Sequence, residues 1–357
     1  MNNKNSKSKF NIMDYEHRVL SNQLNGKINA IFKTSHTKNF EIMDKRIFDL
    51  IFGKVGLNKN KLFRFRFFYI SGLKSLISEL KKTKIPNMKI CKANNTKCDI
   101  DAGEVIDTLL ERDVKLFLHG GTLRDFFMGK HKGTDIDLVF NEPLTFIQTI
   151  CLENAWECPP EKAVPKFQYI LFGGDKGVSL EGVNMNSTFF VPLVRHEFTV
   201  SDLAYDLKNN ILIDITGRGL EDVIYRRIRI TPPEKLWETW ATEDWKKPLR
   251  YFKLELIGMK PVNARTRKFC VNFINDNFED VYMGNLYSTI FVPRILHFLI
   301  ANIAQGELNN ETGKIKHFGP LMERLKNYLH LLSKYIKPEY MQNILNLIKE
   351  RSDIEQT

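Results

Sequence analysis

Two acids one residue apart, Asp135 and Asp137, follow a pair of glycines, Gly120 and Gly121, near the middle of this chain. Side chains alternate between the two faces of a β-strand, so both carboxylates would share one face while Ile136 lies on the other. Carboxylate oxygens are ligands that Mg²⁺ prefers, together with substrate phosphates. Two metals about 4 Å apart can activate an attacking hydroxyl and stabilise a leaving pyrophosphate. The acids therefore predict a two-metal site that binds a nucleoside triphosphate.

The glycine pair supplies the other half of the expected site. Two glycines at the end of a strand allow a tight turn and a close approach of the backbone to a ligand. The helix that follows would offer its N-terminus to an anion, and Arg124 can add a charge-assisted hydrogen bond to a phosphate. A lone Asp-x-Asp or a lone Gly-Gly is common on solvated strands and turns. In this order and spacing, the two together indicate phosphate and metal binding.

Alternating helices and strands should position these residues. The apolar pattern predicts helices at 100–112 and 123–128 and strands at 115–119 and 136–140. Further strands are expected at 167–172, 178–185, 198–205 and 211–215. This order indicates an α/β (α+β) catalytic head with a mixed sheet over residues 100–230, ending near the Pro232-Pro233 pair.

Different patterns flank the expected head. Beyond residue 236 a period near 3.6 predicts an all-α neck and shortened body over 231–357, with helices around 286–303 and 320–348. Residues 1–40 lack a sustained period and indicate a flexible basic leader. Residues 41–99 form a basic, mainly helical N-terminal extension. Its segment 61–69 alternates bases with aromatic residues, which suits either a single-stranded RNA platform or a half-buried strand or helix.

The segment 118–140 resembles the first motif of class II tRNA nucleotidyltransferases, the CCA-adding enzymes, and of bacterial-type poly(A) polymerases, in the DNA polymerase beta superfamily. The residues that match this motif are Gly120, Gly121, Arg124, Asp125, Gly129, Asp135 and Asp137. The resemblance extends over residues 100–265. It implies template-independent, Mg²⁺-dependent addition of nucleotides to an RNA 3′ end. It also implies ATP as a substrate, CTP where CCA is added, and a tRNA 3′ end as the partner.

Two blocks resemble family motifs with departures. Residues 195–206 resemble the block that contacts the incoming ribose: Arg195 matches, and Glu197 stands where the family has Asp. Residues 214–223 resemble the glycine-containing element at the end of the head. Glu181, on a neighbouring strand, is the candidate for a third catalytic carboxylate, although a strand glutamate is more often solvent-facing.

The neck motif leaves two registers open. Residues 248–253 resemble the family's neck segment, whose Asp and Arg act as a template for the base. If Pro-Leu-Arg sets the register, Arg250 aligns, Lys247 takes the Asp position and Lys253 takes the last Arg position. Lysine offers no acceptor and no planar fork. In the other register, Asp244 bulges into the acidic position.

Charge and cysteine usage narrow the protein class. The formal net charge is +11, and residues 1–70 hold 14 Lys and Arg against 5 Asp and Glu, a balance of 14 − 5 = +9. That excess suits a polyanion partner or a solvated face. Five cysteines without a CxxC pair argue against a disulfide framework and a structural zinc site, and favour a reducing compartment. No apolar run approaches the roughly 20 residues that cross a bilayer, so no membrane partner is expected.

We expect an intracellular protein, cytoplasmic or nuclear. The first 40 residues contain one arginine and two acids, a poor match to a mitochondrial transit peptide, so mitochondrial import is the unsupported alternative. Three functional alternatives stay open beside CCA addition. They are oligo(A) or poly(A) addition, a diverged paralogue that binds RNA or protein without catalysis, and transfer to a small molecule.

Overall fold

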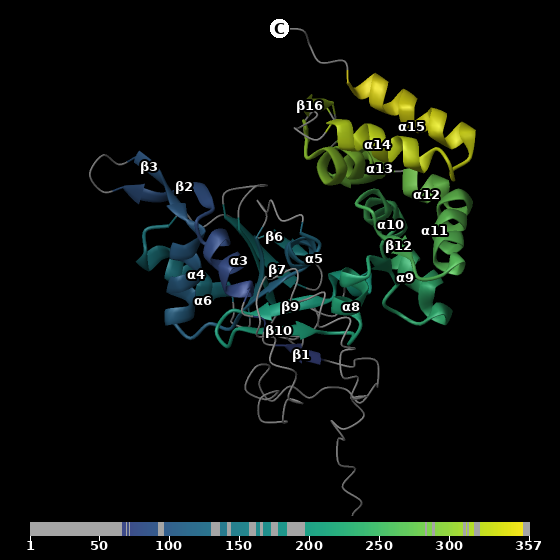
Figure 1. Cartoon of the computed structure of the whole chain (residues 1–357). Coiled ribbons are helices and arrows are strands. Elements are labelled where there is room, and N and C mark those ends of the chain that lie inside the picture. The colour runs from purple at the N-terminus through teal and green to yellow at the C-terminus, as the bar shows by residue number, and fades with distance from the viewer. Residues whose placement is uncertain are drawn as a thin grey trace, which may run out of the picture. The chain divides into compact units, whose positions relative to one another are not determined.

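The computed structural model divides the chain into two compact units, residues 1–225 and 226–357. It describes residues 66–68, 70, 72–91, 96–129, 136–140, 144–156, 162–164, 167–172, 178–183, 197–282, 284–287, 290–309, 312, 314–317 and 322–352. The leader 1–40 and most of the basic–aromatic segment 61–69 lie outside these residues. Each unit is described by itself (Figure 1).

An eight-stranded sheet forms the centre of the first unit. Its strands are β1 (Arg66–Phe68), β4 (Leu116–His119), β5 (Ile136–Phe140), β6 (Lys162–Val164), β7 (Phe167–Phe172), β8 (Val178–Val183), β9 (Leu203–Asp206) and β10 (Ile211–Asp214). They lie in the order β1-β10-β9-β4-β5-β8-β7-β6. The β5–β8 ladder is parallel and the other ladders are antiparallel. This confirms the expected mixed sheet.

Helices cover the sheet and connect its strands. They are α3 (Leu73–Leu80), α4 (Ala102–Glu111), α5 (Gly121–Phe127), α6 (Leu144–Glu153), the 3-10 turn η3 (Thr199–Ser201) and α8 (Gly219–Ile224). A hairpin, β2 (Lys84–Cys91) with β3 (Thr96–Asp101), precedes α4. In the described part of the N-terminal extension, strands therefore occur beside the expected helix. Side chains of β4 and β5 such as Phe117, Leu138 and Phe140 are fully buried in the core.

Residues 198–201 correct the sequence prediction, which placed a strand there. Phe198 stays extended, and residues 199–201 form the 3-10 turn η3, because a buried hydrogen bond, 2.7 Å long, joins the Thr199 hydroxyl to the Asp222 carboxylate on α8. The same region receives a second restraint from Asp214, whose carboxylate accepts the backbone N–H groups of Gly219 and Leu220, each at 3.0 Å. These contacts tie the end of β10 to the start of α8.

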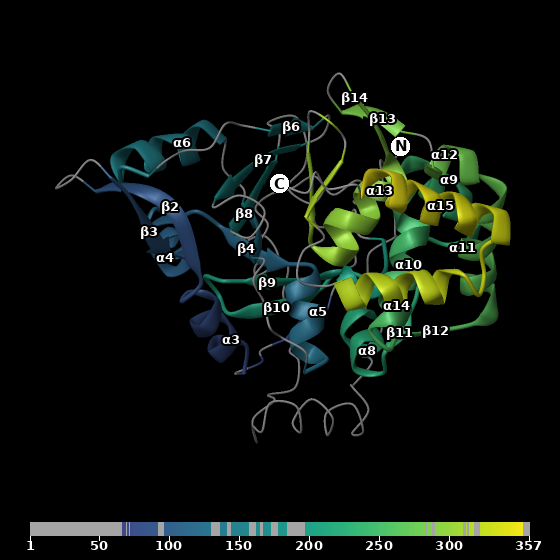
Figure 2. The same cartoon turned by 90° about the horizontal axis from the view of Figure 1, so that it is seen from above.

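The second unit is mainly helical. Its helices are η4 (Glu234–Leu236), α9 (Trp237–Glu243), α10 (Lys246–Leu256), α11 (Ala264–Asp276), α12 (Phe278–Tyr282), α13 (Arg294–His297), the π-helix η5 (Phe298–Ala304), α14 (Met322–Leu332) and α15 (Pro338–Arg351). They form one group, coloured green to yellow in Figure 2. At its centre the buried Tyr328 hydroxyl on α14 donates to the Leu249 carbonyl on α10 at 2.9 Å.

Three short strand pairs, absent from the all-α expectation, lie between these helices. They are β11 (Arg227–Ile228) with β12 (Lys260–Pro261), β13 (Gly284–Tyr287) with β14 (Ile290–Pro293), and β15 (Glu307–Leu308) with β16 (Ile315–His317). The helix predicted at 286–303 therefore begins only after β14. Ile290, Phe291 and Val292 favour a strand, and Pro293 lacks the N–H that a helix interior needs.

Two further observations bear on the protein class. Within the described residues, no helix is both long and apolar enough to span a membrane. Cys98 on β3 forms a disulfide with a cysteine whose side chain lies outside the described residues, which the odd cysteine count did not predict. Cys151 and Cys270 are buried free thiols.

Candidate active site

A glycine bend joins β4 to α5. Gly120 has φ +76° and ψ −139°, a conformation that side chains with a Cβ rarely adopt. A Cβ placed on Gly120 would lie 3.8 Å from the Oδ2 atom of Asp137 on β5. The bend and the Asp137 carboxylate are therefore neighbours.

Arg124 folds back over the same bend. Its Nη2 atom lies 3.3 Å from the point where a Cβ on Gly121 would stand, and its Nε donates to the Asp125 Oδ1 atom at 2.7 Å. The Arg124 side chain is 13% exposed and that of Asp125 is 38% exposed. Asp125, expected among the nucleotide-binding residues, is thus in contact with Arg124 and holds its guanidinium at the bend.

The other acids of the predicted metal site are only partly described. Asp137 is half-buried on β5, between the buried Ile136 and Leu138. Asp135 lies outside the described residues. Glu181 lies on β8, where its register partner across the parallel ladder is Val139, two residues beyond Asp137. Because residues two apart on a strand share a face, the Asp137 and Glu181 positions lie on one face of the sheet.

The surroundings of Asp137 suit Mg²⁺. A partly exposed carboxylate stands beside a glycine bend that carries no side chain, and carboxylate oxygens are ligands that Mg²⁺ prefers. Among the described residues, no group of three His, Cys, Asp or Glu side chains could hold a metal by itself. A complete site would need Asp135 or substrate oxygens as well.

Residues 195–206 resemble the family's ribose-contacting block. Arg195 is outside the described residues, and Glu197 is half-buried, two residues before η3. Sequence reasoning assigned no role to Asp222, which the structure pairs with Thr199 of this block. The signal that could have found it was an acid within the glycine-containing block 214–223, which follows a threonine-containing segment.

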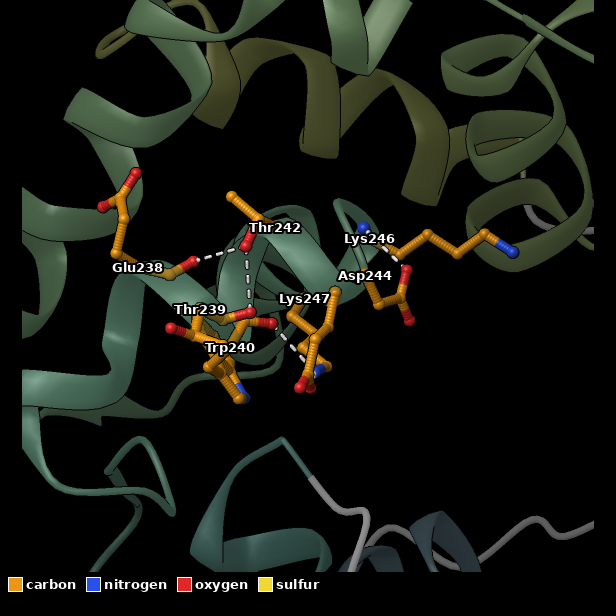
Figure 3. A network of polar contacts seen from close by, with 8 residues as sticks. Glu238, Thr239, Trp240, Thr242, Asp244, Lys246 and Lys247 are labelled. Atoms are coloured by element: carbon orange, nitrogen blue, oxygen red, sulfur yellow. Dashed lines mark hydrogen bonds and ion pairs between the residues drawn. The ribbon is translucent and has the colours of Figure 1, made fainter. Parts of the chain in front are cut away.

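The neck residues lie at the junction of α9 and α10 (Figure 3). The Lys247 ammonium donates to the Trp240 carbonyl at 2.8 Å, approaches the Glu243 carboxylate at 3.4 Å, and lies 5.6 Å from the Trp240 ring centroid. The whole residue is 8% exposed. These contacts make Lys247 an internal partner of α9, and its predicted contact with a nucleotide gains no support from them.

Asp244 occupies the extended residue between the two helices, with φ −150° and ψ 99°. Its Oδ1 atom accepts the Lys246 backbone N–H at 3.1 Å, and its Oδ2 atom has no partner among the described residues. Arg250 and Lys253 follow on α10, three residues apart and half-buried, and burial lowers the pKa of the Arg250 guanidinium. Asp244 thus lies in an extended break between the two helices, and both registers of the neck motif stay predictions.

The comparisons with known proteins find similarity only among solved structures. No protein-family model matches the sequence, and no curated protein matches it. The similar structures are CCA-adding enzymes and tRNA-processing enzymes, which bear the name of the family whose motifs the sequence resembles.

Three of these structures illustrate the extent of the match. A CCA-adding enzyme with CTP is 16% identical at a TM-score of 0.40, over 71% of this chain and 52% of that chain. The Thermotoga maritima CCA-adding enzyme complexed with tRNA is 16% identical at 0.41, over 70% and 64%. A tRNA nucleotidyltransferase with a primer tRNA and an incoming ATP analogue is 18% identical at 0.40, over 68% and 62%. This chain spans about half to two thirds of their lengths.

Proposed function

We propose that this chain is a template-independent RNA nucleotidyltransferase that adds nucleotides to an RNA 3′ end. The observation that carries the proposal is the meeting of three groups: the Gly120 bend, the Arg124 guanidinium folded over Gly121, and the Asp137 carboxylate beside Gly120. A positive group and an acid on either side of a bare backbone suit a triphosphate and its counter-ions.

The residues take the following roles. The backbone of Gly120 and Gly121 lets the triphosphate approach, and Arg124, held by Asp125, binds its oxygens. Asp137, with Asp135, would hold Mg²⁺, which supplies Lewis-acid stabilisation of phosphate charge when bound. The RNA 3′-oxygen forms a bond to the α-phosphorus while the bond from the α-phosphorus to the pyrophosphate oxygen breaks. Pyrophosphate leaves, and the hydroxyl proton passes to water.

We propose CCA-like addition to tRNA before oligo(A) addition, and Asp244 is compatible with selection of both C and A. A carboxylate whose Oδ1 is fixed by the Lys246 N–H, with Oδ2 available, can accept a hydrogen bond from the amino group of cytosine or adenine. Uracil has no such amino group. Arg250 and Lys253, expected beside it, would complete the contacts to the base.

Nucleotide incorporation tests the proposal. Purified protein is incubated with Mg²⁺, each labelled NTP and a tRNA transcript that lacks its terminal CCA. We expect incorporation of C and A by the parent, its loss in Asp135→Ala/Asp137→Ala, and its retention in Asp107→Ala, which removes an exposed acid on α4 that pairs with Lys81.

The other outcomes separate the alternatives. Incorporation of A alone would indicate oligo(A) addition. Tight RNA binding by the parent without any incorporation would indicate the non-catalytic paralogue. Equal incorporation by the double variant and the parent would exclude the two acids as metal ligands.

A further inference from the structure

Two segments of the second unit are strongly basic. Residues 226–230 and 260–268 together contain seven cations and no acid: Arg226, Arg227, Arg229, Lys260, Arg265, Arg267 and Lys268. The segments are 30 residues apart in the sequence. Neither segment contributes to the active site described above.

The fold brings the two segments side by side. Strands β11 and β12 pair in parallel, with Arg227 opposite Lys260. The Lys260 N–H donates to the Arg226 carbonyl at 2.8 Å, and the Val262 N–H donates to the Ile228 carbonyl at 3.0 Å. Ile228 is fully buried and anchors the pair. Cations from two distant segments therefore meet on one short strand pair.

Some of these cations are already engaged by acids. Arg267 binds the Glu255 carboxylate at 2.6 Å, and Arg265 approaches the Glu234 carboxylate at 3.4 Å. Arg226 and Lys260 are both exposed, and neither has an ion-pair partner within the part of the chain that the structure describes. Among the described residues, no acid neutralises the charge of these two side chains.

Arg226 is also held in an unusual backbone conformation. Its φ is +54°, in the left-handed region where glycine is favoured. Its Nη1 atom lies 3.8 Å from the point where a Cβ on Gly258 would stand, and Gly258 has φ +89°. The guanidinium thus lies over a second left-handed turn. An arginine held where glycine would be less strained suggests that the charge itself has a use.

We infer that Arg226 and Lys260, here called the β11–β12 basic edge, bind the phosphate backbone of RNA. The inference rests on the proposed function, which makes RNA the substrate, and on charge complementarity with a polyanion. The edge would hold the RNA body by its phosphates while the 3′ end is extended elsewhere. Such contacts position a nucleic acid without reading its sequence.

The double variant Arg226→Gly/Lys260→Gln tests the inference. Binding of a fluorescent tRNA transcript lacking CCA is measured by anisotropy in EDTA from 50 to 300 mM KCl. Loss of two phosphate contacts should weaken binding about 30-fold near 0.1 M KCl and reduce the slope of log K against log salt by about 1.5. The matched control is Lys334→Gln/Lys349→Gln, which removes two exposed charges on the α14–α15 side of the unit.

Stability provides an independent readout. Arg226→Gly alone should keep or raise the Tm, because glycine relieves the left-handed strain, while it weakens RNA binding. An affinity loss with a lowered Tm would overturn the inference, and so would equal losses in the control. Absence of RNA binding by the parent, or unchanged affinity in the double variant, overturns it as well. The double variant is also tested against phosphatidylserine vesicles and polyglutamate. If it loses binding to either of these but keeps its affinity for RNA, the inference is contradicted.

The two proposals fail separately. Asp137→Ala should bind RNA like the parent in EDTA even though it cannot extend it. If the parent incorporates nucleotides and the Arg226→Gly/Lys260→Gln variant binds RNA as tightly as the parent, only the inference about the basic edge is refuted. A parent that binds through the edge but incorporates nothing would refute the proposed activity alone.

Discussion

Replacement of Lys247 distinguishes a residue that packs α9 against α10 from one that reads a nucleotide. We consider Lys247→Met, which keeps an unbranched apolar chain, and Lys247→Asp, which installs the acid of the related neck motif. A hydrogen bond from a charged group contributes about 1.5–3 kcal/mol, and a cation over an aromatic ring about 0.5–2 kcal/mol. Lys247 makes one of each, to the carbonyl and the ring of Trp240.

The two variants should therefore differ sharply in stability. Methionine leaves the Trp240 carbonyl unpaired but removes a buried charge, and such exchanges are often close to neutral, so we expect a loss below about 1.5 kcal/mol. Aspartate places a second carboxylate near Glu243 and empties the space of the lysine chain, so we expect a loss of about 3–5 kcal/mol. The favourable effect of an acid at a helix N-terminus, about 0.3–1 kcal/mol, is too small to compensate.

Urea unfolding followed by tryptophan fluorescence measures the difference, because Trp240 on α9 contacts Lys247 and Trp245 lies between α9 and α10. The same proteins are assayed for CTP and ATP incorporation beside Asp244→Asn. We expect Lys247→Met to keep the parent's choice of nucleotide, and Asp244→Asn to lower kcat/KM for CTP about tenfold, since it loses one acceptor. Equal stability of Lys247→Asp and the parent, or a changed nucleotide choice in Lys247→Met, would refute the packing role.

Three glycine substitutions test the other restraints. Gly219→Ala should lower the free energy of unfolding by about 3 kcal/mol in urea melts, because its Cβ would lie 2.5 Å from the Thr199 carbonyl oxygen; a loss under about 1 kcal/mol would contradict this packing. Gly120→Ala should cost about 1–3 kcal/mol of stability through backbone strain and also weaken triphosphate binding in titration calorimetry. Gly121→Ala should weaken triphosphate binding without lowering stability, because its Cβ would lie 3.3 Å from the Arg124 Nη2 atom and displace the guanidinium. Unchanged triphosphate binding in both Gly120→Ala and Gly121→Ala would show that the bend is not part of the binding site.

Strand identity was predictable where mainly apolar residues run between clear breaks. The bounds 136–140 and 167–172 agree with β5 and β7, because each segment holds a single polar residue and ends at polar or glycine-rich residues. The expected helix at 100–112 begins only at Ala102, since β3 extends to Asp101 to complete its hairpin. Local pattern does not reveal such a pairing.

Sequence predictions failed where contacts between distant residues determine the local structure. Thr199 favours a strand by propensity, yet its hydroxyl bonds to Asp222, 23 residues away, and the segment turns. In the neck, the spacing of Pro-Leu-Arg leaves two registers open, with Lys247 or Asp244 at the acidic position. The Lys247 ammonium donates to the carbonyl of Trp240, a backbone atom that no sequence pattern exposes. The metal ligands and nucleotide contacts stay predictions.

The strand order also bears on how the chain is made. The central strands β4 and β5 carry the glycine bend and Asp137, yet their outer neighbours are β9 and β8, which come later in the sequence. Between the synthesis of residue 140 and that of residue 206, about 3–13 s at ordinary translation rates, at least one of these strands has an open edge on the nascent chain, because β8 is complete at residue 183 and β9 only at residue 206. Unpaired edges invite intermolecular pairing. We therefore expect the yield of folded protein to depend on ribosome-associated chaperones that cover these strand edges during synthesis.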